Sequence, residues 1–95
     1  MEKVFEKNGY TMKVAKFDNG DVRYVAFQKP QENQVTINSN VRGVLDNTIS
    51  ELTVSWAGSG QVSIEKAQNM VEDLNVALET IEFFSEKLKE EGLME

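Results

Sequence analysis

Carboxylates are the side chains whose number and spacing could do chemistry in this chain, because histidine and cysteine are both absent. Their absence removes the usual general base, every thiol nucleophile and the commonest ligands of transition metals. Glutamates recur at intervals of seven near the C-terminus, and a pair such as Glu82 and Glu86 could share a proton or hold a divalent cation. A charge run at this spacing is more typical of a solvated helix face. We therefore predict no enzymatic activity, no cofactor and no metal.

Two short glycine-containing segments resemble parts of binding motifs. Asp18-Asn19-Gly20-Asp21 begins like a calcium loop, but the later ligands and the bidentate glutamate do not follow. Gly58-Ser59-Gly60 precedes an expected helix, where free backbone N–H groups can hold a phosphate, yet no lysine lies within it and no nucleotide-binding motif surrounds it. We interpret the first segment as a hairpin turn and the second as a linker.

The clearest structural signal is one long amphipathic helix at 63–91, which follows a linker at 58–62. Apolar residues recur there every three or four positions, as they do along one stripe of a helix. Ser63 is placed to cap the first turn and Gly92 to end the helix in a left-handed conformation. The stripe comprises Ile64, Ala67, Val71, Leu74, Leu78, Ile81 and Leu88, widened by Met70, Ala77 and Phe84.

Residues 1–57 are predicted to form an antiparallel sheet. Asn8-Gly9 joins the first two strands, because both residues tolerate the positive φ that a two-residue hairpin turn requires. Such a turn fixes the register, so Phe5 should face Met12 and Met12 should face Phe27. One face of the first three strands then becomes core and carries Phe5, Tyr10, Met12, Val14, Val25 and Phe27.

The later part of the sheet is less regular. Pro30 ends the first three strands because it cannot donate to a central ladder, and alternating patterns indicate strands at 34–38 and 50–56. Segment 39–47 has no consistent pattern. The predicted fold is a single α+β domain at 1–95, an antiparallel β-meander of four to five strands packed against one long C-terminal α-helix. Where sheet and helix meet, we expect Val54, Trp56, Leu74 and Leu78 in the core.

The expected helix is longer than the sheet that it covers. About 27 helical residues span about 40 Å, whereas five strands spaced about 4.8 Å apart span only about 20–25 Å. The distal half is the more apolar, so we expect it to extend beyond the sheet and to pair with a second copy in a dimer. Val76 and Phe83 add a second apolar ridge, although single exposed apolar residues are also normal on protein surfaces. The expected interface residues are Met70, Val76, Phe83, Phe84 and Leu88.

Charge is divided unevenly along the chain. Residues 1–44 hold seven basic and five acidic side chains, and residues 45–95 hold three basic and eleven acidic ones. Basic and aromatic side chains on the second face of the first three strands are the combination that binders of single-stranded nucleic acid use, although the net charge of −6 disfavours phosphates. The candidate residues for this alternative are Lys13, Lys16, Phe17, Arg23 and Tyr24.

The acidic second half supports the reverse hypothesis. An acidic helix can mimic a phosphate backbone and occupy a basic site on another protein. The candidate residues for this alternative are Glu65, Glu72, Glu79, Glu82 and Glu86.

Membrane insertion and export are not expected from this sequence. No apolar run approaches the roughly 20 residues that span a bilayer, and Met1 is followed by Glu2 rather than by a basic segment and an apolar core. We therefore predict a cytoplasmic protein. Its predicted function is that of a non-enzymatic interaction module or small accessory subunit, self-associating through its C-terminal helix.

Overall fold

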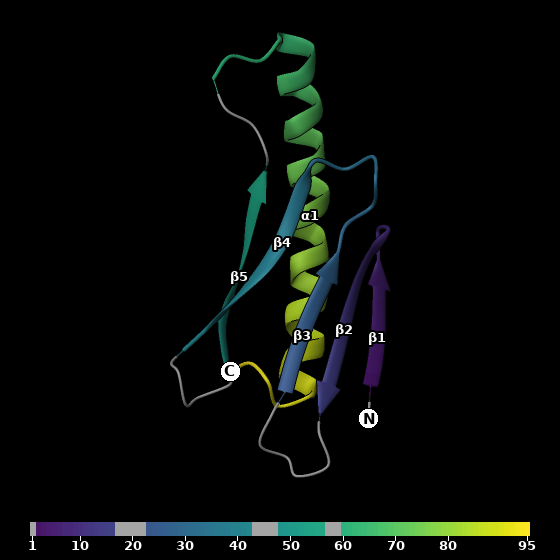
Figure 1. Ribbon diagram of the computed structural model, residues 1–95, viewed down its shortest axis with the longest axis vertical. Helices are drawn as coiled ribbons and strands as arrows, with labels where there is room; N and C mark the ends of the chain where they lie inside the picture. Colours follow the sequence, from purple (N-terminus) through teal and green to yellow (C-terminus); the bar gives the residue numbers. More distant parts are fainter. Residues whose placement is uncertain (1, 17–22, 43–47, 57–59) are drawn as a thin grey trace.

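The computed structural model describes residues 2–16, 23–42, 48–56 and 60–95. These residues form an α+β fold, as predicted, in which five antiparallel strands lie in two sheets of three and two strands beside one long helix (Figure 1). The sheets have the strand orders β1-β2-β3 and β4-β5. The elements are β1 (Glu2–Lys7), β2 (Tyr10–Lys16), β3 (Arg23–Gln28), β4 (Val35–Val41), β5 (Ile49–Trp56) and α1 (Ile64–Glu90).

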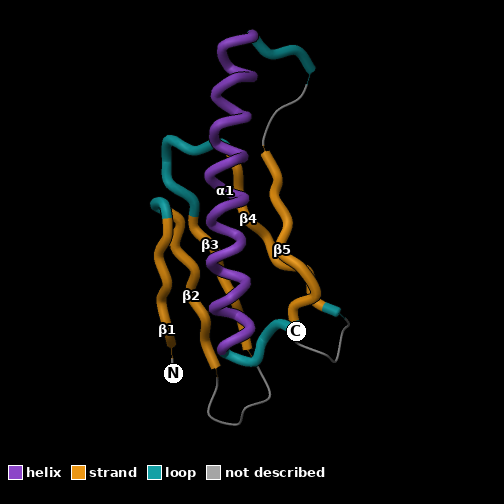
Figure 2. Tube along the Cα trace, turned by 180° about the vertical axis from the view of Figure 1, so that it is seen from behind, coloured by secondary structure: helices purple, strands orange, loops and turns teal. Residues whose placement is uncertain are grey.

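The molecule is elongated along the helix, with extents of 50 × 25 × 19 Å. Seen from behind, α1 crosses in front of the strands, with β5 on one side and β1, β2 and β3 on the other (Figure 2). The three-stranded sheet covers only the end of α1 nearer to the C-terminus, and the start of the helix projects past it (Figure 1). One half of α1 therefore packs on the three-stranded sheet and the other half does not.

The first hairpin confirms the predicted turn and register. Asn8 and Gly9 both have positive φ, at 54° and 82°, and Phe5 pairs with Met12 and Met12 with Phe27. A Cβ added to Gly9 would also lie 2.9 Å from the Cγ atom of Pro30. Glycine is thus required at this position both by the turn conformation and by the close approach of the next loop.

The core lies where β2, β4 and α1 meet. Tyr10, Met12 and Val14 of β2 are buried together with Val35 and Ile37 of β4. The Tyr10 hydroxyl donates a hydrogen bond of 2.5 Å to the carbonyl oxygen of Val35, and so links the two sheets. Burial, with a smaller contribution from the negative charge of Asp73, raises the pKa of Tyr10 to about 12. The phenol is therefore held neutral as a donor across the junction of the sheets.

The start of β4 is tied to the middle of the helix. Asn33 is buried, and its Oδ1 atom accepts a hydrogen bond of 2.8 Å from the backbone N–H of Val35. The neighbouring N–H of Gln34 donates to Oδ2 of Asp73 at 3.0 Å. Residues 39–41, which showed no pattern in the sequence, complete β4.

Only part of the predicted apolar stripe of α1 faces the core. Leu74 is half-buried against the core as expected, but Leu78 and Trp56, both expected inside, are about half exposed. Ile64, Val71 and Leu78 are exposed, whereas Ala77 and Phe84, each one residue before a position seven apart in that row, are buried. The helix buries Ala77, Phe84 and Leu88, together with the hydroxyl-bearing Thr80.

The placement of α1 along the sheet also differs from the prediction. The distal half does not extend beyond the sheet, because its large side chains are the ones that fill the core. The ring centroid of Phe84 lies 5.9 Å from that of Phe27 in β3, and Asn8 Nδ2 donates to Thr80 Oγ1 at 3.2 Å. The exposed large apolar side chains of α1 lie instead within residues 64–78, toward the start of the helix.

Candidate interaction surface at the start of the helix

Three apolar side chains of α1 are exposed at intervals of seven residues. Ile64, Val71 and Leu78 have exposed fractions of 80%, 58% and 48%. Because seven residues make almost two full helical turns, the three lie along nearly one line, which we name the helix ridge. Single exposed apolar residues need no explanation, but a continuous row of them indicates an interaction surface.

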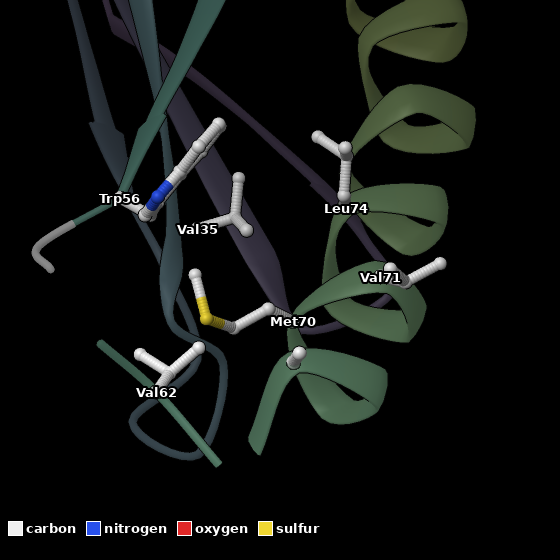
Figure 3. Close-up of a pocket in the computed structure, with 7 residues that line it drawn as sticks. Val35, Trp56, Val62, Met70, Val71 and Leu74 are labelled. Atoms are coloured by element: carbon white, nitrogen blue, oxygen red, sulfur yellow. The ribbon is translucent and has the colours of Figure 1, made fainter. Parts of the chain in front are cut away.

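An apolar groove lies beside the helix ridge, between α1 and the ends of β4 and β5 (Figure 3). In this view Trp56 and Val35 stand on the strand side, and the Met70 side chain points from the helix toward them. The groove has a volume of about 260 Å³. We name it the helix–strand groove; it is lined by Val35, Trp56, Val62, Ala67, Met70, Val71 and Leu74.

The lining of the helix–strand groove favours apolar contact over chemical catalysis. None of its seven residues carries a titratable group, and the indole of Trp56 is the one polar group among the side chains. The volume exceeds that of an engineered cavity of about 150 Å³ that binds benzene, and falls below the roughly 300–1,000 Å³ of drug-sized pockets. The groove therefore fits one or two apolar side chains of a partner.

Local sequence explains why the helix starts where it does. Ser63 is extended, with φ −66° and ψ 158°, and its Oγ accepts a hydrogen bond of 3.1 Å from the N–H of Lys66. Glu65 places a negative charge in the first turn, where the helix dipole favours it. The predicted cap is confirmed, and it holds the first turn of a segment that the three-stranded sheet does not support.

The structure places the five residues expected to form the interface in three different environments. Phe84 and Leu88 are fully buried in the core of their own chain, so they have no surface for a second copy, and their expected exposure was wrong. Val76 and Phe83 are half-buried against the core, and the Phe83 ring lies 5.7 Å from Lys7 Nζ. Of the five residues, Met70 alone lines the helix–strand groove.

The candidate nucleic-acid face is partly acidic. Lys13 and Tyr24 are exposed on the sheet face that α1 does not cover. The register places Glu2 and Glu6 on the same face, and the Tyr24 hydroxyl lies 3.4 Å from Oε2 of Glu2, which accepts its hydrogen bond. These carboxylates oppose the approach of phosphates. Lys16 and Arg23 are paired in the β2–β3 register, and Phe17 lies outside the described residues.

The predicted acidic face lies on the outer side of α1. All its members, Glu65, Glu72, Glu79, Glu82 and Glu86, are exposed. Among the described parts of the chain, no group of three or more carboxylates is placed to hold a metal ion. The hypothesis that this face mimics nucleic acid stays a prediction. The calcium-loop resemblance at 18–21 and most of the 58–60 segment fall outside the described residues.

Sequence reasoning missed the helix–strand groove because it assigned Trp56 to the core. The available signal was Ser85, which interrupts the line through Ile64, Val71 and Leu78, whereas the line through Met70, Ala77 and Phe84 continues without a polar residue. A polar residue at one repeat of a stripe indicates that the stripe is not buried along its whole length.

No helix in the described part of the chain is long and apolar enough to cross a membrane. Comparison of the sequence with models of protein families and with curated proteins, and of the structure with solved structures, found no match.

Proposed function

We propose that this chain is a non-enzymatic protein-interaction module that self-associates through the first half of α1. The observation that carries the proposal is the helix ridge, in which Ile64, Val71 and Leu78 stay exposed at regular intervals. Burying each large apolar side chain contributes roughly 1.5–3 kcal/mol, so a partner that covers the row gains a useful driving force.

The helix–strand groove supports the same proposal. Its apolar lining and its volume of about 260 Å³ suit one or two side chains of a protein partner. Binding energy in protein interfaces concentrates where a few apolar or aromatic anchors enter such pockets. Trp56, half exposed at the groove, is a residue type that is enriched among these anchors.

The test is the molar mass in solution, measured by light scattering over a concentration series. Val71→Glu places a charge at the centre of the helix ridge, and Val41→Glu places the same charge on β4 at a valine of nearly the same exposure, 57% against 58%. We expect the native chain and Val41→Glu to have twice the mass of one chain, and Val71→Glu to have the mass of one. A native chain that stays monomeric at every concentration contradicts the proposal.

A further inference from the structure

The turn of the first hairpin, Asn8-Gly9, has the sequence at which an asparagine most readily loses its side-chain amide. The backbone nitrogen of the residue after an asparagine can attack the asparagine Cγ atom, and glycine leaves this nitrogen unobstructed because it has no side chain. Asn8 and Gly9 are both exposed at the tip of the hairpin. The turn therefore presents an accessible amide beside an accessible nitrogen.

The nitrogen that would attack is not used by the fold. The pairing of Lys7 with Tyr10 closes the strands on either side of the turn, so Gly9 lies outside the ladder. No hydrogen bond joins the Gly9 N–H to another residue in the part of the chain that the structure describes. The reaction at Asn8 therefore breaks no backbone hydrogen bond of the turn when it begins.

The other asparagines among the described residues lack this combination. Asn33 is buried, and the N–H after it, that of Gln34, donates to a helix carboxylate. Asn40 and Asn75 are exposed like Asn8, but a branched valine follows each of them and obstructs the next backbone nitrogen. Of the asparagines that the structure describes, Asn8 alone is followed by glycine.

The group that would leave is tied to the helix. Asn8 Nδ2 donates to Thr80 Oγ1 at 3.2 Å, and the Thr80 hydroxyl donates in turn to the carbonyl oxygen of Val76 at 2.7 Å. Because its one hydrogen is used there, Thr80 Oγ1 faces Asn8 as an acceptor. The Asn8 side chain does not rotate freely while this hydrogen bond lasts, so the contact slows the reaction.

We propose that Asn8-Gly9 is a site of spontaneous deamidation, restrained by Thr80. The Gly9 nitrogen gives up its proton to hydroxide and bonds to Cγ of Asn8; the bond from Cγ to Nδ2 breaks, and Nδ2 takes up a proton and leaves as ammonia. Water then opens the resulting cyclic imide at either carbonyl, giving aspartate or isoaspartate at position 8. The net change is the gain of a water and the loss of an ammonia, and it does not depend on the proposed self-association.

Isoaspartate changes the length of the turn. The backbone then runs through the side-chain carbons of residue 8, so the two-residue turn gains an extra backbone atom. That turn sets the register in which Lys7 pairs with Tyr10, and the Tyr10 hydroxyl links the two sheets through Val35. The modification therefore weakens the link between the sheets, whereas aspartate, which tolerates positive φ, keeps the turn.

Peptide mapping of the aged protein tests the site. The folded chain is held at mildly alkaline pH and digested with trypsin, and the mass of each peptide reports the change from amide to acid. Asn8 falls in peptide 8–13, and the other described asparagines fall in peptides 24–42 and 67–87. We expect conversion in peptide 8–13 and little in the other two. Equal conversion in all three, or conversion at Asn8 only in urea, overturns the proposal.

Thr80→Val tests the restraint, because it removes the acceptor and keeps the shape of the side chain. We expect Asn8 to convert about fivefold faster in this variant, the factor that loss of one hydrogen bond implies. Thr80→Ser is the matched control that keeps the hydroxyl, and it should convert at close to the native rate. Circular dichroism confirms that both variants are folded. Identical rates in all three chains overturn the restraint by Thr80.

A comparison of the two products tests the effect on the sheets. Asn8→Asp supplies the aspartate form directly, with the same added charge as isoaspartate. Asn19→Gln is included in every chain to remove the second Asn-Gly pair of the sequence. The isoaspartate form is isolated from aged protein by ion exchange, and we expect it to unfold at a lower urea concentration than Asn8→Asp. The same unfolding midpoint for both overturns the proposed effect on the sheets.

Discussion

Both halves of α1 carry large apolar side chains, but the two sets lie in different environments. In the second half, Phe84 and Leu88 are fully buried against the strands, whereas in the first half Ile64 and Val71 are more than half exposed. Helical periodicity therefore does not by itself determine burial. What differs is the sheet, which supplies Phe27 and the first hairpin to one half only.

The largest expected effect on stability comes from a substitution in the buried half of α1. Phe84→Ala removes a fully buried ring that packs against Phe27, and we expect it to lower the free energy of unfolding by about 3–5 kcal/mol. Leu78→Ala, at a half-exposed position, should cost about 1 kcal/mol or less in the monomer. Urea unfolding of both variants measures the difference, and equal losses would contradict the contrast between the halves.

The next effect concerns the link between the two sheets. The folded state raises the pKa of Tyr10 from its ordinary value of 10.0 to about 12. Below pH 10 the phenol is protonated in the folded and unfolded chains alike, so it adds no pH dependence. Between pH 10 and 12 the folded chain keeps a proton that the unfolded chain loses, and stability falls as the pH rises, by about 2–3 kcal/mol in total.

Tyr10→Phe is the matched control for this pH dependence, because it keeps the ring and removes the titrating hydroxyl. We expect the variant to be less stable at neutral pH by about 1 kcal/mol, since the hydrogen bond to Val35 is lost. Its stability should then fall less steeply between pH 10 and 12 in chemical denaturation. Identical slopes in the two proteins would exclude Tyr10 as the source.

A smaller effect concerns the start of the exposed half. Ser63→Ala removes the side-chain acceptor for the N–H of Lys66, and we expect a loss of about 1 kcal/mol in the first turn. Amide hydrogen exchange should quicken in that turn and stay unchanged around Phe84. Ser63→Asp is the control that keeps an acceptor, and it should restore slow exchange.

The smallest expected effect concerns the acidic surface around the helix ridge. Glu72 and Glu79 are exposed beside the helix ridge, so we expect their charges to oppose the proposed pairing at low ionic strength. Raising the salt screens this repulsion, and we expect the dissociation constant of the dimer to fall a few-fold. Sedimentation equilibrium at two salt concentrations measures it. Glu72→Gln should bind more tightly at low salt and respond less to added salt.

Local signals in the sequence were sufficient for much of the fold. Asn8-Gly9 determined a two-residue turn, and from the turn followed the pairing of Phe5 with Met12 and of Met12 with Phe27. Ser63 and Gly92 likewise marked the two ends of the helix, because capping depends on backbone groups within one turn. Each of these interactions joins residues close together in the chain or directly paired by a turn.

The candidate surface could not be derived in the same way. Two apolar stripes of α1 have four residues in common, namely Ala67, Leu74, Ile81 and Leu88. One stripe adds Ile64, Val71 and Leu78, and the other adds Met70, Ala77 and Phe84. Periodicity therefore allowed either stripe to face the sheet. The position of the helix along the sheet was also undetermined, and the prediction placed the wrong half in the core. Both choices depend on contacts between residues far apart in the chain, such as Phe27 with Phe84.

The sequence by itself determined the type and order of the elements, the two ends of the helix, the register of the first three strands and the charge of the helix. The tertiary structure decided which half of α1 the core would take and which apolar row would remain in water. The physical reason is that hydrogen bonding in turns and caps is local, whereas burial of Phe84 or exposure of Val71 depends on whether a distant strand lies against that face of the helix.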